Sequence, residues 1–250
     1  MAENYFTEKV LVLREVKYKD ADKILTLYSA ERGKFTARAV AALRKASRIA
    51  SATQQLTYAE MTFYESHGRT GVKEAQILED FADLKSDFAD YALGCYFAEC
   101  VEQLSEEGLE DADILQLILN ALFALSRKLY LPQTVKAAFE MRLMSLQGYR
   151  PDLSGCEVCG KEDPEFPNLC VNSGKLICSS CRKASFEIFA PLSGCALRSL
   201  RTIVSAGPKA FIPKDLPPED TDLLSYACET FLLEHAERRF STLEYWKKVR

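Results

Sequence analysis

The chain has few histidines and lacks the common signatures of nucleotide-binding and hydrolytic sites. Its 250 residues include only two histidines, His67 and His235. A zinc deaminase needs H-x-E together with P-C-x-x-C, and His67 is followed by Gly68 and Arg69 instead. Neither a P-loop nor a G-x-G-x-x-G loop occurs. These absences argue against an enzyme, so we interpret His67 as a solvated loop residue and His235 as a packing or capping residue.

The sequence also lacks an apolar run long enough to cross a bilayer. The longest apolar stretch, Ile114–Leu125, is short and is interrupted by Gln116 and Asn120. The first ten residues contain no apolar signal core. We therefore expect a cytoplasmic protein without a membrane partner, in which the nine cysteines are reduced or metal-bound. Four of them read as small buried hydrophobic residues: Cys95, Cys100, Cys195 and Cys228.

Four other cysteines form the most specific pattern in the chain. Cys156 and Cys159 make one C-x-x-C pair, and Cys178 and Cys181 make a second pair after eighteen intervening residues. Thiolates at this spacing bind zinc tetrahedrally in structural sites, because two intervening residues let one turn present both sulfurs. Residues 169–177, with a turn at 172–174, are predicted to form a hairpin that delivers the second pair. The sequence thus predicts a structural Zn²⁺ site.

Other interpretations of these cysteines are weaker. Disulfides need an oxidising compartment, and a thioredoxin-like motif needs one C-x-x-C beside a βαβ unit. Cys170 lies within the predicted hairpin without a partner two residues away, which favours packing over service as a substitute ligand. A site closed by four thiolates has no coordination position left for water, which again argues against catalysis.

The charge is unevenly distributed. The net charge is −4, yet residues 1–80 carry 13 Lys and Arg against 11 Asp and Glu, whereas residues 81–250 carry 19 against 25. From Arg32 to Ala59 there are six basic residues and no acidic one. Because anion binding depends on the local field, this segment is the best candidate for a nucleic-acid contact.

The first 80 residues read as strands. Alternating apolar residues predict strands at 8–18, 24–28, 35–40, 56–64 and 72–78, with a polar helix over 47–55. Three strands, a short helix and two strands suit a five-stranded Greek-key barrel of the OB type, although a generic small β domain fits the periodicity equally well. OB barrels bind single strands on a sheet face, where strand aromatics stack bases. The predicted DNA-binding residues are Arg32, Lys34, Phe35, Arg38, Arg44, Lys45 and Arg48.

Four strand aromatics are candidates for base stacking: Tyr28, Phe35, Phe63 and Tyr64. Successive strand residues face opposite sides of a sheet, so we expect about half of these four to be buried in the core instead.

After residue 80 the apolar period changes to three and four, which predicts helices. They are expected from Phe81 to Gly108, around 114–125, from Pro132 to Gly148, from a Ser193 cap through Val204, and from about Glu219 to Phe240. The fold class is therefore α+β, with an N-terminal barrel and a helical domain interrupted by a zinc finger. The predicted domains are 1–80 for the barrel, 81–150 with 186–250 for the helical part, and 151–185 for the zinc finger.

Over essentially its whole length, the chain resembles the RecO family of bacterial DNA repair proteins. The most specific residues are Gly148-Tyr149-Arg150-Pro151 leading into Cys156–Gly160. Supporting segments are 18–22, 31–34, 44–48 and 240–243. The family is usually richer in Gly, Lys and Arg after the third strand, where this chain has Ala41-Ala42-Leu43.

The resemblance implies a fold and a function. It implies an OB domain, a helical domain and a four-cysteine zinc finger. It also implies a recombination mediator that binds single- and double-stranded DNA, anneals complementary strands, and with RecR helps load RecA onto DNA coated with single-strand-binding protein (SSB). The implied partners are RecR, the acidic C-terminal tail of SSB, and in some members RecF and RecA. The implied location is the bacterial cytoplasm, associated with the nucleoid.

Two rival functions remain open from the residues alone. One is a protein-interaction adaptor whose barrel binds no nucleic acid, which the acidic sequence pI of about 5.5 favours. The other is a nucleic-acid-processing enzyme. Binding of labelled single strands across a salt series distinguishes the mediator from the adaptor, and hydrolysis assays with magnesium test the enzyme.

Overall fold

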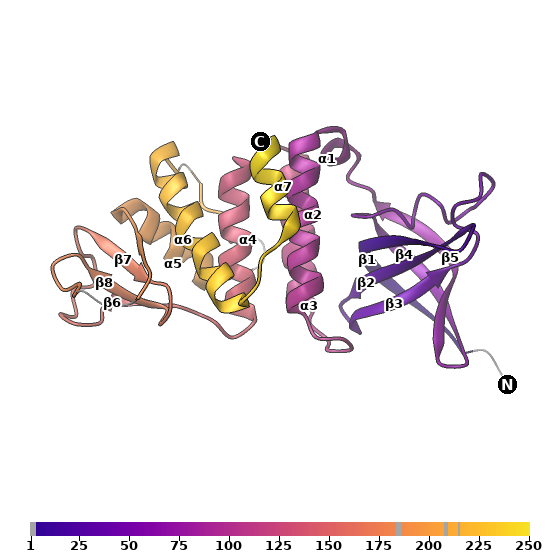
Figure 1. Ribbon diagram of the computed structural model, residues 1–250, viewed down its shortest axis with the longest axis horizontal. Helices are drawn as coiled ribbons and strands as arrows, with labels where there is room; N and C mark the ends of the chain where they lie inside the picture. Colours follow the sequence, from indigo (N-terminus) through magenta and orange to yellow (C-terminus); the bar gives the residue numbers. More distant parts are fainter. Residues whose placement is uncertain (1–3, 184–186, 208–209, 215) are drawn as a thin grey trace. The chain divides into compact units, whose positions relative to one another are not determined.

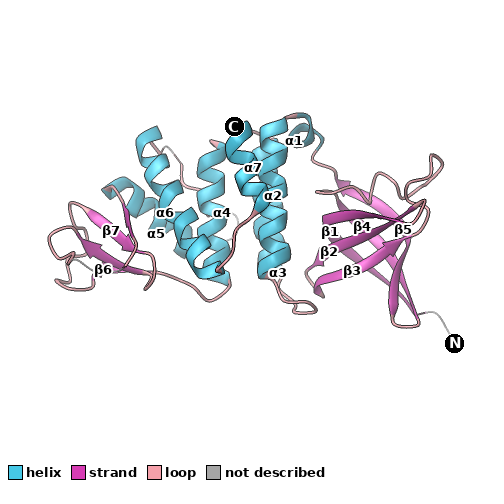
Figure 2. Ribbon diagram, viewed as in Figure 1, coloured by secondary structure: helices cyan, strands magenta, loops and turns pink. Residues whose placement is uncertain are grey.

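The structure is a computed structural model that describes residues 4–183, 187–207, 210–214 and 216–250 (Figure 1). The chain forms two compact units. Unit 1 comprises Met1–Ser126 together with Phe240–Arg250, and unit 2 comprises Arg127–Arg239. Each unit combines strands with helices (Figure 2), which confirms the α+β class. The domain limits expected from the sequence remain predictions, and the limit at 185–186 falls outside the described residues.

Unit 1 begins with a closed five-stranded barrel of strand order β1-β2-β3-β5-β4. Every neighbouring pair is antiparallel except β3 and β5, which are parallel at Arg38 and Gly71. This closure is the OB-type arrangement that the strand order predicts. The strands are β1 (Asn4–Tyr18), β2 (Asp22–Ser29), β3 (Gly33–Ala39), β4 (Tyr58–Ser66) and β5 (Arg69–Glu79).

Strand alternation fills the barrel interior. β1 is long enough to pair with β4 through its first half and with β2 through its second, with a bulge between Val12 and Arg14. Such bulges bend a strand and increase its twist, which helps a small sheet to close. Inward residues two apart on each strand form one apolar cluster, which includes Val10, Val12, Leu25, Leu27, Ala37, Ala39, Met61 and Phe63.

The segment between β3 and β4 is a chain of turns, so the prediction of a helix over residues 47–55 was wrong. One helical turn exists, in which Thr53 N–H donates to Ile49 C=O at 3.1 Å, and tighter turns follow. The backbone then bonds to β1: Leu56 N–H donates to Val12 C=O at 2.9 Å, and Val12 N–H donates to Thr57 C=O at 3.0 Å. Because these groups are held by a neighbouring strand, they cannot continue an i to i−4 ladder. The side chain of Ile49 packs into the apolar cluster of the barrel and holds the segment against it.

The helices of unit 1 depart from the prediction at two places. The helix expected from Phe81 is split into α1 (Ala82–Ser86) and α2 (Phe88–Leu104) at Asp87, whose side chain accepts the N–H groups of Ala89 and Asp90. Polar capping of this kind starts a new helix. α3 (Ala112–Ser126) lies where it was predicted. α7 (Ser241–Val249), which was not predicted, packs on α2 (Figure 1).

Unit 2 contains α4 (Pro132–Leu146), α5 (Gly194–Ser205) and α6 (Pro218–Ala236). Pro132 occupies the first position of α4, and the hydroxyl of Ser193 accepts Ala196 N–H at 2.9 Å to cap α5, as the sequence predicts. α6 ends earlier than expected because Glu237 adopts a left-handed conformation, with φ of 50°. A fully buried Lys136 joins α4 to α6, since its Nζ lies 2.9 Å from Glu140 and 2.8 Å from Glu229.

A small four-stranded sheet completes unit 2, in the order β6-β8-β7-β9. The predicted hairpin is present as β7 (Pro167–Cys170) and β8 (Lys175–Cys178). It is flanked by β6 (Asp152–Cys156) and β9 (Phe189–Pro191), which were not predicted. β6 has five residues and β9 has three, which is too short for strand periodicity to be recognised in the sequence. They form strands because the edges of the β7–β8 hairpin offer backbone groups for pairing. No helix in the described part of the chain has the length and hydropathy that a bilayer crossing requires.

Candidate metal centre and nucleic-acid interface

Two backbone turns present the four cysteines. Cys156 ends β6, and Gly160 N–H donates to its carbonyl at 2.8 Å, so the chain folds back after Cys159. Gly160 has φ of +72°, which glycine adopts without strain. Cys178 ends β8, and Cys181 N–H donates to its carbonyl at 3.0 Å. The parallel pairing of β6 with β8 brings the two turns together.

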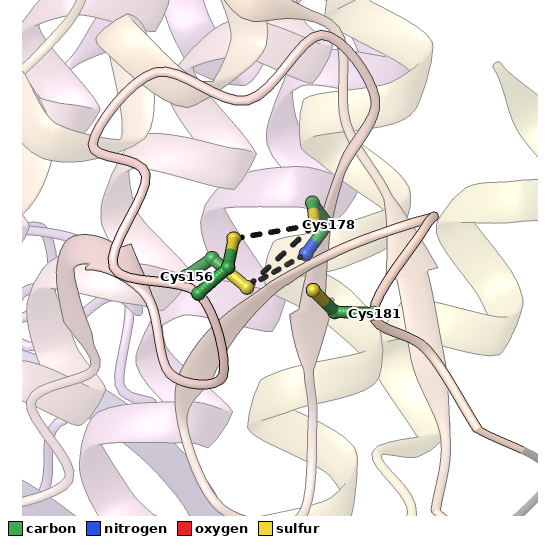
Figure 3. A group of neighbouring side chains, drawn as sticks. Cys156, Cys178 and Cys181 are labelled. Atoms are coloured by element: carbon green, nitrogen blue, oxygen red, sulfur yellow. Dashed lines mark hydrogen bonds between the residues drawn. The ribbon is translucent and has the colours of Figure 1, made fainter.

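The four sulfurs have the geometry of a tetrahedral metal site. All lie within 4.8 Å of one another. The Cys178 sulfur is 3.7 Å from that of Cys156 (Figure 3). It is 3.8 Å from that of Cys159. A regular tetrahedron with Zn–S bonds of about 2.3 Å has edges of about 3.8 Å, so the donor set fits zinc. Among the described residues this is the only such cluster, and the buried Cys170 lies outside it.

The surroundings of the cluster stabilise the thiolates of Cys156 and Cys178 but not that of Cys181, and the thiolate is the form that binds metal. Burial opposes ionisation of Cys156, but backbone N–H groups of Cys159 and Cys178 lower the pKa of its thiol to about 6. The pKa of Cys178 is also lowered, chiefly by the Ser180 hydroxyl. The pKa of Cys181 is raised to about 12, first by its hydrogen bond with Cys178. Because the thiols lie so close together, each thiolate that forms makes ionisation of the next thiol less favourable. All four lose their protons together only when a bound cation offsets the negative charge.

Contacts from α6 hold the hairpin that carries the second pair. The Nε2 of His235 lies 2.9 Å from Val171 C=O, and its ring packs against Phe231 with 4.2 Å between centroids. The Nδ2 of Asn172 donates to Glu234 at 2.6 Å. His235 is therefore a packing residue that ties the sheet to α6.

A groove of about 600 Å³ crosses the outer face of the barrel over β2 and β3, beside the β4–β5 turn. Three half-buried or exposed aromatic rings line it, contributed by Tyr18, Phe35 and Tyr64. Two arginines, Arg38 and Arg69, add positive charge, and Glu107 adds one negative charge. This combination suits a single strand, since bases stack on aromatic rings while phosphates meet cations. The remaining candidate aromatics, Tyr28 and Phe63, are fully buried, so half of the four were in the core, as expected.

A glycine sets the position of one groove ring. Gly71 is the cross-strand partner of Tyr64. A Cβ built at Gly71 would lie 2.3 to 2.5 Å from atoms of the Tyr64 ring, so the ring lies directly over the bare backbone. Aromatic rings commonly cover a cross-strand glycine in this way.

The predicted DNA-binding residues divide into three groups by their contacts. The first group is partly exposed, but its charged groups already bind other parts of the protein. Arg32 donates to Glu8 at 2.6 Å, lies near Glu65, and stacks on the Phe6 ring at 3.9 Å. Lys34 donates to the carbonyls of Glu102 and Ser105, each at 2.6 Å, and so caps the C-terminal end of α2.

The second group lines the groove. Phe35 packs edge-on against Phe63, at 5.5 Å between centroids, and exposes the rest of its ring. Arg38 donates twice to Asp22, at 2.9 and 2.5 Å. The N–H of Ala41 and then Arg38 lower the pKa of Asp22, and this pairing raises the pKa of Arg38. Arg38 thus enters the groove with its charge partly balanced.

The third group is exposed to solvent and forms no ion pairs within the described residues. Arg44, Lys45 and Arg48 are exposed on the turns that follow β3, and none pairs with a carboxylate among the described residues. Arg69, which was not predicted, is equally exposed and unpaired there. Arg69 and Tyr18 were missed because only the barrel closure brings them to the same face; neither lies in the acid-free segment.

Comparison with known proteins shows matches over nearly the whole chain. The model described as "Recombination protein O N terminal" matches residues 1–81, and "Recombination protein O C terminal" matches residues 85–244. A DNA repair protein RecO from Heliobacterium modesticaldum is 32% identical over 209 residues, covering 82% of this chain and 75% of the relative. One from Acetivibrio thermocellus is 26% identical over 246 residues, covering 98% of each.

Proposed function

This chain belongs to the RecO family of DNA repair proteins, and from that premise we propose that it is a non-enzymatic recombination mediator. It binds single- and double-stranded DNA, anneals complementary strands, and with RecR helps load RecA onto SSB-coated DNA. The observation that supports this most directly is the barrel groove, which is lined by three aromatic rings and two arginines; exposed cations also lie on the turns that follow β3, at Arg44, Lys45 and Arg48. We further propose RecR, the SSB C-terminal tail, RecF and RecA as partners, in a nucleoid-associated cytoplasmic location.

Each part of the chain has a place in this proposal. The groove residues hold unstacked bases, and the exposed basic turns neutralise phosphates. Cys156, Cys159, Cys178 and Cys181 hold one structural Zn²⁺, which orders the β6–β9 sheet. Because four thiolates complete the coordination of zinc, the metal supplies stability rather than a reactive water. Arg32 and Lys34 were also predicted to bind DNA. We propose instead that they stabilise the barrel and its contact with α2.

A salt series on labelled single-stranded DNA tests the proposal. Four free cations, the three on the turns and Arg69, predict a slope of log K against log salt of about −3, at roughly 0.7 per phosphate contact. Replacing Arg44, Lys45 and Arg48 together by alanine should flatten the slope by about two and weaken binding to all sequences alike, since phosphate contacts carry no base information. Circular dichroism should be unchanged because the three side chains are exposed.

A parent protein without measurable strand binding at low salt would instead support the adaptor. An unchanged slope in the triple variant would show that the basic turns are only solvated surface.

Gly71→Ala tests the groove without changing any charge. The new methyl group must displace the Tyr64 ring, because the two would otherwise overlap. Losing one stacking ring costs about 1–3 kcal/mol, so strand affinity should fall about tenfold while the salt slope stays constant. Gly207→Ala, whose new Cβ would meet no atom of the described residues within 4 Å, is the matched control and should bind like the parent. Equal affinity of the two variants would remove Tyr64 from the binding surface.

A further inference from the structure

A second hollow in unit 1, here called the acidic cleft, adjoins the groove, shares Phe35 and Glu107 with it, and has the opposite net charge. Its volume is about 580 Å³. Four carboxylates line it, together with two cations and one aromatic ring. The lining residues are Glu8, Glu31, Arg32, Lys34, Phe35, Glu107, Gly108 and Glu110.

The acidic cleft is firmly built. Its walls are β1, the β2–β3 turn and the loop between α2 and α3. Gly108 N–H donates to Lys34 C=O at 3.0 Å, which fixes this loop to the turn. The loop also lies so close to Gly33 that a Cβ there would come within 1.9 Å of Leu109 C=O. Since Gly33 has φ of +59° as well, only glycine fits, and the walls keep their spacing.

The two cations of the lining are already engaged. Lys34 is bound to the end of α2, and Arg32 is bound to Glu8 and Glu65. Glu31, Glu107 and Glu110 are exposed and pair with no cation among the described residues, so the cleft carries excess negative charge.

Glu8 supplies the observation that points to a ligand. Its side chain is only 10% exposed, and one carboxylate oxygen accepts from Arg32. The other oxygen, Oε2, is buried and has no hydrogen-bond partner in the described residues. Glu8 lines the cleft, and a buried carboxylate oxygen without a donor is costly, so a ligand that donates to Glu8 would remove that cost. Nearby, the pKa of Tyr58 is raised by burial and then by the charge of Glu31.

We propose that the acidic cleft binds an arginine side chain presented by a protein partner. A planar guanidinium can donate two hydrogen bonds to a carboxylate while its face rests on an aromatic ring, here Phe35. The chain already shows this mode internally, where Arg32 pairs with Glu8 and stacks on Phe6. A bare metal ion fits less well, because no three carboxylates of the cleft converge within the described residues.

The inference does not depend on strand binding, so its test omits DNA. Calorimetry at about 20 mM salt, where screening is weak, would measure binding of a blocked glycine peptide containing two arginines. The same peptide with two lysines, and MgCl₂ alone, are the comparison ligands. The test variant is Glu107→Gln with Glu110→Gln, both on the exposed loop. Its matched control is Glu74→Gln with Glu165→Gln, which removes the same charge at exposed positions elsewhere.

The arginine peptide should bind the parent and lose about tenfold in affinity with the cleft variant, but less than about twofold with the control. The lysine peptide and Mg²⁺ should bind more weakly than arginine. Equal losses in both variants would reduce the effect to net charge and overturn the site. Binding of lysine or Mg²⁺ as tight as that of arginine would overturn the guanidinium assignment.

Discussion

Removing zinc should unfold the β6–β9 sheet while the barrel stays intact. Structural zinc contributes on the order of 10 kcal/mol to ordering such a site. All four candidate ligands belong to unit 2, and none comes from unit 1. We therefore expect Cys156→Ser, or treatment with a strong chelator, to abolish amide protection across residues 152–183 while protection of β1–β5 persists.

Hydrogen exchange followed by mass spectrometry resolves the two outcomes segment by segment. Elemental analysis of the untreated protein should find one zinc per chain. Cys195→Ser is the control, since Cys195 is a cysteine of the same unit outside the cluster. Retained protection after complete metal removal, or less than half an equivalent of zinc with all thiols free, would contradict the assignment.

Replacing Tyr18 and Tyr64 together by alanine should weaken single-strand binding about a hundredfold. Each stacking ring contributes about 1–3 kcal/mol, and both rings line the same groove. The salt slope should not change, because no cation is removed. This signature is the reverse of the one expected for the arginine and lysine variant, which alters the slope.

Phe166→Ala with Tyr226→Ala serves as the matched control, because these two aromatics are at least as exposed but lie in unit 2. Thermal unfolding should confirm that both double variants fold. If the groove variant and the control bind strands equally well, the bases are not held in this groove, although the basic turns remain able to hold the backbone.

Local patterns in the sequence were sufficient for much of the fold. The C-x-x-C pairs, the cap at Ser193 and Pro132 at the start of α4 act through neighbouring residues, so their effects can be read from short windows. Strand alternation likewise predicted the five strands, although by itself it fitted a generic small β domain as well as an OB barrel. The helix expected at 47–55 failed because Leu56 and Thr57 bond to β1, a partner that no local window contains.

The candidate interface was harder to predict for the same reason. Arg32 and Lys34 belong to an acid-free stretch, yet their partners lie elsewhere in the chain, at Glu8 and at the carbonyl of Glu102. The charge of the local sequence therefore overestimated how many of its basic residues are available to bind DNA. Conversely, Arg69 stands apart from that run and reaches the groove only through the pairing of β3 with β5.

The position of α7 has a consequence for how the protein is made on the ribosome. Unit 1 includes Phe240–Arg250, so its two parts are separated by the 113 residues of Arg127–Arg239. Translation adds about 5–20 residues per second, so α7 is synthesised on the order of ten seconds after the first part of unit 1 is complete.

During that interval α2 lacks contacts made by the returning segment. Phe240 packs edge-on against Tyr96 at 5.7 Å, and Thr242 N–H donates to Glu99 at 3.0 Å. The barrel can close early, but the helices beside it mature only after unit 2 has emerged. A nascent chain is thus exposed to misassembly at α2 until Phe240–Arg250 has been translated.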